Sequence, residues 1–146
     1  MAFNMPIQGI GSNDISDLSF DRNKSISILS YAALEKLMGS ANLQFSYDTR
    51  FNIYDLFSKN QLDQPEIDIV TEFVSTTKKN IDFLYFALNT GLAVFKFEND
   101  GGATRVLARI TMIVRAYNQF IDEIIIKFPE LERNSDCYYY SPQNYC

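Results

Sequence analysis

The sequence predicts an all-α fold: an antiparallel helical bundle of about four helices, built on one long helical hairpin. Two segments, at about 64–97 and 103–128, carry apolar residues at alternating steps of three and four, which keeps one face of a helix against its neighbour. The pair Gly101–Gly102 between them is typical of a turn. With 146 residues, 47% of them hydrophobic, the chain is long enough to bury a core as one domain.

The first arm of the hairpin begins with a helix start signal. Asp63 suits the N-cap, Pro65 suits the first turn, and Glu66 lies three residues after the cap. Gly91 could end this helix, but the apolar spacing continues past it, so we expect one helix to about residue 97. Thr77 is the weak member of the apolar row. The row is Ile67, Val70, Val74, Thr77, Ile81, Leu84, Leu88, Leu92 and Phe95.

The second arm has a broader apolar face. Its residues cover an arc roughly 140° wide, which is typical of a helix that contacts two or more neighbours. Met112 and Ile126 lie on the otherwise polar side, either exposed singly or as part of a further contact, and Pro129 ends the helix. The row is Val106, Ile110, Ile113, Tyr117, Phe120, Ile124 and Phe128, widened by Leu107, Val114, Ile121 and Ile125. An alternative for residues 92–106 is a β-hairpin.

Two shorter helices complete the predicted bundle, which spans residues 21–130. One covers 25–38 and ends at Gly39. Residues 43–47 alternate like a short strand, although helix or loop is also compatible with them. Asp48 or Thr49 then caps the second short helix.

Residues 1–20 are predicted to form an extended N-terminal arm. Glycine, proline and small polar residues disfavour a helix there, yet the segment is too apolar for a solvated tail. We expect the arm to bind a surface, either on its own domain or on a neighbouring subunit, and we favour the neighbour. The candidate contact residues are Phe3, Met5, Ile7 and Ile10.

Residues 131–146 are predicted to form an irregular, tyrosine-rich tail. Tyrosines combine a large apolar ring with a polar tip, which suits a partly buried contact. The candidate contact residues are Tyr138, Tyr139, Tyr140 and Tyr145. They either bind a partner or cover the edge of the protein's own core. Cys137 and Cys146 are compatible with a disulfide or with two thiols.

The residue types argue against catalysis. The chain has no histidine, which excludes Ser-His, Cys-His and His-metal sites. The glycine pair lacks the further glycine and lysine of a phosphate-binding loop, and the acidic pairs lie where solvated or capping carboxylates are ordinary. We therefore expect no catalytic residue, no cofactor and no metal.

Charge and hydropathy restrict the partners. A net charge of −5 and a pI near 4.6 argue against a nucleic-acid partner, because phosphate binding needs a clustered basic face. The sequence shows no signal peptide and no apolar run of roughly 20 residues, so we expect a soluble protein with no membrane span.

These observations favour a non-catalytic structural or adaptor subunit of a large protein assembly, such as a virion or phage particle, a filament or a multi-subunit complex. The arm and the tail would contact other protein subunits, in a homo- or hetero-oligomer. The alternative is a small helical ligand-binding or regulatory module with an aromatic-lined pocket between helices.

Overall fold

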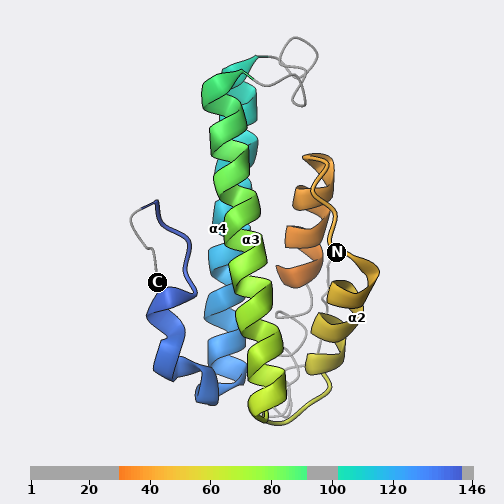
Figure 1. Ribbon diagram of the computed structural model, residues 1–146. Helices are drawn as coiled ribbons and strands as arrows, with labels where there is room; N and C mark the ends of the chain where they lie inside the picture. The colour runs from red at the N-terminus through yellow and green to blue at the C-terminus, as the bar shows by residue number, and fades with distance from the viewer. Residues whose placement is uncertain (1–29, 92–101, 143–146) are drawn as a thin grey trace, which may run out of the picture.

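The computed structural model describes residues 30–91 and 102–142, and every regular element in that part of the chain is helical (Figure 1). The elements are a helix at 30–40, α2 (Tyr47–Leu56), α3 (Gln64–Thr90), α4 (Ala103–Lys127) and the 3-10 helix η2 (Pro129–Cys137). The predicted all-α class and the helical hairpin are confirmed. No helix in the described ranges is both long and apolar enough to cross a membrane.

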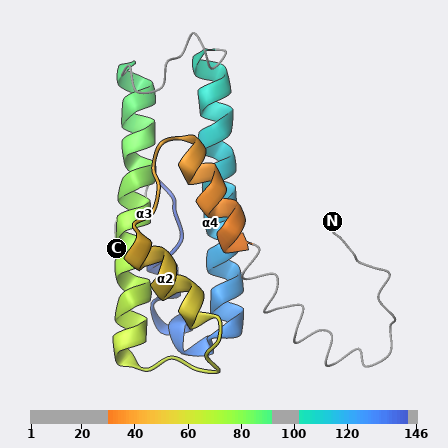
Figure 2. The same ribbon diagram turned by 90° about the vertical axis from the view of Figure 1, so that its right-hand side faces the viewer.

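The two long helices α3 and α4 lie antiparallel in the middle of the molecule. The helix at 30–40 and α2 lie on one side of this pair, while η2 and the residues after it lie on the other (Figures 1 and 2). α2 packs on α3, and η2 packs on α4. The hairpin is therefore covered on two sides, as its broad apolar face predicts.

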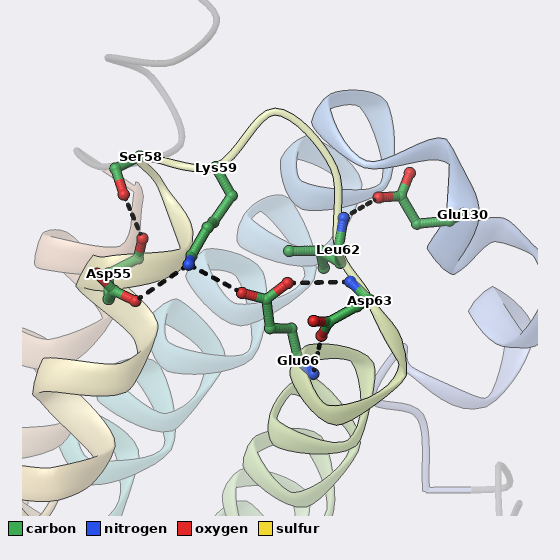
Figure 3. A network of polar contacts seen from close by, with 7 residues as sticks. All are labelled: Asp55, Ser58, Lys59, Leu62, Asp63, Glu66 and Glu130. Atoms are coloured by element: carbon green, nitrogen blue, oxygen red, sulfur yellow. Dashed lines mark hydrogen bonds and ion pairs between the residues drawn. The ribbon is translucent and has the colours of Figure 1, made fainter.

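The start of α3 confirms the predicted cap. The Asp63 carboxylate accepts a hydrogen bond from the Glu66 backbone N–H at 3.0 Å, and the Glu66 carboxylate accepts one from the Asp63 N–H at 2.9 Å. Lys59 pairs with Glu66 at 3.1 Å, and Glu130 of η2 accepts from the Leu62 N–H (Figure 3). This network joins the α2–α3 connection to both α3 and η2.

The end of α3 differs from the prediction. The helix ends at Thr90, and Gly91 adopts a left-handed conformation with φ 68°, so the predicted continuation to residue 97 is wrong at this point. Glycine takes this conformation at little steric cost, so the helix ends here although the apolar spacing continues past it. α4 begins at Ala103, so the β-hairpin alternative is wrong for 103–106. Residues 92–101, with Leu92 and Phe95, lie outside the described residues.

The helix at 30–40 also ends differently. It continues past Gly39, and Asn42 takes the left-handed conformation with φ 63°. The Leu43 N–H donates to the Met38 carbonyl, and the Asn42 N–H donates to the Gly39 carbonyl, which is the Schellman pattern of a helix end. Residues 25–29 of the predicted helix lie outside the described residues.

The start of α2 lies slightly earlier than predicted. Ser46 is the N-cap, and its hydroxyl accepts from the Thr49 N–H at 3.1 Å. Neither Asp48 nor Thr49 is therefore the cap. Residues 43–46 form no strand, and Tyr47 is already helical.

The predicted apolar rows form the core. In α3 the row from Val70 to Leu84 is buried, including Thr77 at 0% exposure. All seven members of the second row are buried as well, from Val106 in α4 to Phe128 at its C-cap. Leu107 is the exception, because 44% of it is exposed although it was expected to widen the apolar face.

An aromatic cluster joins the elements around this core. Tyr31 lies 5.4 Å from Phe120 and 5.9 Å from Phe73, measured between ring centroids, and Phe73 lies 5.8 Å from Phe120. Phe45 and Phe57 also contact the Tyr31 ring. The helix at 30–40, α2, α3 and α4 are thus fixed to one another by tilted and edge-on ring contacts.

Candidate functional site

The tyrosines of the C-terminal tail pack on their own chain. Tyr138 and Tyr140 are 3% and 6% exposed. Asn118 of α4 accepts from the Tyr140 N–H at 2.8 Å and donates to the Tyr140 carbonyl at 3.2 Å. The Tyr140 hydroxyl donates to Asp82 of α3 at 2.6 Å, and its ring stacks on Tyr85.

The neighbouring backbone and side chains extend this attachment. The Tyr117 hydroxyl donates to the Tyr138 carbonyl, and Tyr139 donates to Asp122 at 2.6 Å. Burial, followed by the Asp122 carboxylate, raises the pKa of Tyr139 to about 12. Lys78 donates to the Cys137 carbonyl at 2.8 Å. The tail therefore closes over α3 and α4 as a fixed part of the bundle.

Of the predicted interface residues the structure describes Tyr138, Tyr139 and Tyr140, and their contact with a partner stays a prediction. Tyr138 and Tyr140 cover the edge of their own core, the other possibility that the sequence allowed, and they leave little surface for a partner. Tyr139 is partly buried. The other candidates, Phe3, Met5, Ile7, Ile10 and Tyr145, lie outside the described residues, as does Cys146.

The free end of the α3–α4 hairpin presents a different apolar surface. Figure 1 shows that this end extends beyond the helix at 30–40, α2 and η2. Four large apolar side chains are exposed toward the connected ends of α3 and α4, on residues 83–91 and 102–112, which we call the hairpin end; within it, Tyr85 still contacts Tyr140 of the tail. The four exposed side chains are Phe83, Phe86, Leu107 and Met112, at 42%, 58%, 44% and 55% exposure.

Helix geometry explains why these residues cannot reach the core. Phe83 and Phe86 are three residues apart and lie on the side of α3 away from the buried Ile81 and Leu84. In the sequence they are two phenylalanines outside the apolar row, and the periodicity of the core face does not account for them. Met112 was noted on the polar side of α4, and its exposure leaves it accessible for a contact.

A second exposed stripe lies on α2. Tyr47, Phe51 and Tyr54 recur at i, i+4 and i+7 and therefore share one face of the helix. Their exposures are 77%, 59% and 37%. The buried Ile53 and Leu56 occupy the opposite face. We call the three exposed residues the α2 stripe.

The structure also shows where a small ligand could enter. A groove of about 290 Å³ lies between α2 and α3. Its lining is mixed, with the rings of Phe45 and Phe73 beside the polar Asn52 and Glu72. Another gap, enclosed by apolar side chains that include Phe57, Phe73, Phe120 and Phe128, has a volume of only about 10 Å³, which is the space of a single water molecule.

Within residues 30–91 and 102–142, no three potential metal-binding side chains cluster. Comparison of the chain with family models, with curated proteins and with solved structures finds no match. The exposed apolar surfaces and the groove are thus the features of the described residues that bear on function.

Proposed function

We propose that the chain is a non-catalytic subunit of a larger protein assembly, and that it binds neighbouring subunits through the hairpin end. The observation that supports this most directly is the exposure of Phe83, Phe86, Leu107 and Met112 toward the connected ends of α3 and α4. Phe83 and Phe86 are three residues apart and share one side of α3, and neighbouring exposed apolar residues are typical of protein contact sites, whereas singly scattered ones need no explanation.

The shape of the hairpin supports the same proposal. The connected ends of α3 and α4 extend past the helix at 30–40, α2 and η2, so a partner can approach them without displacing these elements (Figure 1). The helices are held rigidly below these ends by the aromatic cluster and the tail. A rigid element that presents aromatic side chains loses little side-chain entropy on binding.

The assembly proposal shifts the contact away from the tail. The arm and the tail are both predicted to bind other subunits, but Tyr138 and Tyr140 are buried within their own chain. The contribution of the arm stays a prediction. A ligand-binding module with an aromatic-lined pocket has less support, because the enclosed gap between the core rings is too small for an organic ligand and the groove of about 290 Å³ between α2 and α3 is lined largely by polar side chains.

The experiment is to substitute Phe86→Asp in the full chain and to measure its assembly by sedimentation velocity over a wide concentration range. We expect the unsubstituted chain to form a defined oligomer, because burying the hairpin end removes apolar surface from water. Phe86→Asp should weaken this association at least tenfold, since a carboxylate would have to be desolvated in the contact.

Ile126→Asp is the matched control. Ile126 is 67% exposed and lies near the other end of α4, so its substitution should leave assembly unchanged. A photo-crosslinking residue at position 86, with one at 126 for comparison, extends the test to partners other than the chain itself. A chain that stays monomeric at every concentration, and that forms no adduct from position 86 in its native cell, would overturn the proposal.

A further inference from the structure

We infer that the α2 stripe is the binding site for the N-terminal arm (residues 1–20) of the same molecule, whose Phe3, Met5, Ile7 and Ile10 cover Tyr47, Phe51 and Tyr54. This inference concerns a different surface from the hairpin end. It also assigns the arm to its own domain rather than to the neighbouring subunit that the sequence analysis favoured.

The stripe exposes a large aromatic surface. Tyr47 and Phe51 are more than half exposed, and Tyr54 is 37% exposed. Phe and Tyr side chains contribute strongly to burial when they are covered, and aromatic residues are enriched in contact surfaces. Three exposed aromatic residues in one row of a ten-residue helix form a continuous surface, whereas single exposed apolar residues are ordinary.

The inner end of the stripe is fixed in position. The ring of Tyr54 meets the ring of Tyr31 edge-on, with 5.0 Å between centroids. Glu35 accepts from the Arg50 guanidinium at 2.6 Å and lies 3.4 Å from the Tyr54 hydroxyl. These contacts tie α2 to the helix at 30–40. The stripe is thus a preformed surface, and an occupant need not order it.

The point at which the described chain begins favours the arm as the occupant. Residues 1–29 lie outside the described part and join it at Ser30, which is bound to α4 through Glu123. The next residue, Tyr31, contacts the stripe at Tyr54. The segment that leads to the arm therefore joins the described structure close to the α2 stripe.

Length and composition fit the same occupant. α2 has ten residues and is about 15 Å long, a distance that about five extended residues span. The arm is joined to Ser30 by more than enough chain to reach Tyr47. In an extended segment, residues two apart share a face, so Phe3, Met5 and Ile7 can contact one row together. Tethering also raises the effective concentration of the arm at the stripe well above that of a second molecule.

The test uses the absence of tryptophan from the chain. Phe51→Trp places a single fluorophore in the stripe, and Phe86→Trp places one on the hairpin end as the matched control. In each background the arm is left intact or changed by Phe3→Asp, Met5→Asp, Ile7→Asp and Ile10→Asp together. Emission wavelength and quenching by acrylamide report the exposure of the tryptophan.

We expect Trp at position 51 to emit at shorter wavelength and to be quenched severalfold more slowly with the intact arm than with the changed arm. The difference should be independent of protein concentration, and position 86 should not respond. If the arm changes have no effect on position 51, the inference is overturned. Protection that depends on protein concentration would assign the arm to a second copy and would overturn it as well.

A reciprocal measurement avoids any effect of the arm substitutions on folding. Ile7→Trp places the fluorophore in the arm, and Phe51→Ser removes the centre of the stripe, an exposed position where substitutions cost little stability. We expect the emission of Trp at position 7 to shift to longer wavelength with Phe51→Ser but not with Phe86→Ser. No shift in either chain contradicts the inference. Assembly through the hairpin end is measured separately, at Phe86, so the two proposals fail independently.

Discussion

The buried hydroxyl groups differ in whether they find a hydrogen-bond partner. Tyr117 donates to the Tyr138 carbonyl, whereas the hydroxyls of Thr77 and Tyr31 have no partner among the described residues. A buried hydroxyl without a partner opposes folding, because it gives up its hydrogen bonds to water. Thr77 was the weak member of the predicted apolar row, and the structure places it in the core all the same.

Thr77→Val should therefore stabilise the protein. Valine has nearly the shape of threonine and removes the unpartnered hydroxyl, so we expect the free energy of unfolding to rise by about 1 kcal/mol. Urea denaturation followed by circular dichroism measures it. Thr77→Ala is the control, because it removes the same hydroxyl but also a methyl group, and it should destabilise by leaving a small cavity. Equal loss in both variants would show that the hydroxyl has a partner.

Tyr117→Phe should have the opposite effect. The substitution leaves the ring in place but leaves the buried Tyr138 carbonyl without its donor, at a cost of about 1–3 kcal/mol. Tyr139→Phe is the matched control, since its hydrogen bond to the exposed Asp122 is replaced by water. Denaturant unfolding measures both variants. Equal destabilisation would contradict the assigned difference.

The sequence could not predict these pairings. The spacing of apolar residues places Tyr117 on the core side of α4, but no local pattern relates it to a carbonyl in the tail. For the same reason, the sequence could not decide whether Tyr138 and Tyr140 contact a partner or their own core. An aromatic ring with a polar tip suits an internal edge as well as an interface, and only the fold decides which one it covers.

The start of α3 was more predictable than its end. The capping box at Asp63 and Glu66 is a local pattern of hydrogen-bonding groups, so the sequence contains it completely. The end at Gly91 is also local, but it competed with an apolar spacing that continues to Phe95. At the end of the helix 30–40, Asn42 and not Gly39 adopts the left-handed conformation. Both residue types occur at this position, so the sequence alone does not decide between them.

Asp63→Ala should destabilise α3 by about 1 kcal/mol, because the side chain that satisfies the Glu66 N–H is lost. Asp63→Asn is the control, since an amide oxygen also caps and should retain most of the stability. Hydrogen exchange of the first turn of α3 measures the local effect. Equal exchange in both variants would contradict the cap.

The same cap should weaken in acid. The hydrogen bond from the Asp63 backbone, followed by the one from Lys59, holds the pKa of Glu66 below its usual value. A lowered folded pKa means that the stabilisation is present above the unfolded pKa and is lost as the pH falls through the folded value. The pH dependence of unfolding should therefore become shallower in Glu66→Gln on the acid side. An unchanged acid profile would show that the carboxylate is not stabilised there.

Gly91→Ala should cost about 1 kcal/mol, because an alanine at φ 68° places its Cβ against the following carbonyl. Gly91→Asn should cost less, since asparagine tolerates the left-handed region. Thermal unfolding measures the two variants. If alanine is tolerated as well as asparagine, α3 continues past Thr90 in solution.

At the scale of the whole molecule, the sequence predicted the class of fold better than the exposed surfaces. The apolar periodicity of the two long helices predicts that one face of each is buried. The turn between them predicts that they form a hairpin. Which apolar residues stay outside depends on where the neighbouring elements end. Leu107 belongs to the apolar arc of α4, yet it is 44% exposed near the start of that helix.

The attachment of the tail and of the helix 30–40 should make the whole molecule sensitive to alkali. Burial raises the pKa of Tyr31 and of Tyr117, since the charged phenolate is poorly solvated in the core. A raised folded pKa means that the stabilisation is complete below the unfolded value near 10 and is lost as the pH rises above it. Each of these two tyrosines should reduce the free energy of unfolding by about 1.4 kcal/mol per pH unit over that range.

Tyrosinate absorbance and circular dichroism, recorded together during an alkaline titration, measure this effect. We expect part of the tyrosinate signal to appear only as the helical signal is lost, because those groups ionise after the core opens. Tyr117→Phe should make the alkaline loss of stability less steep, although it lowers stability at neutral pH. If all tyrosines ionise while the helices persist, the tail and the helix 30–40 do not close the core in solution.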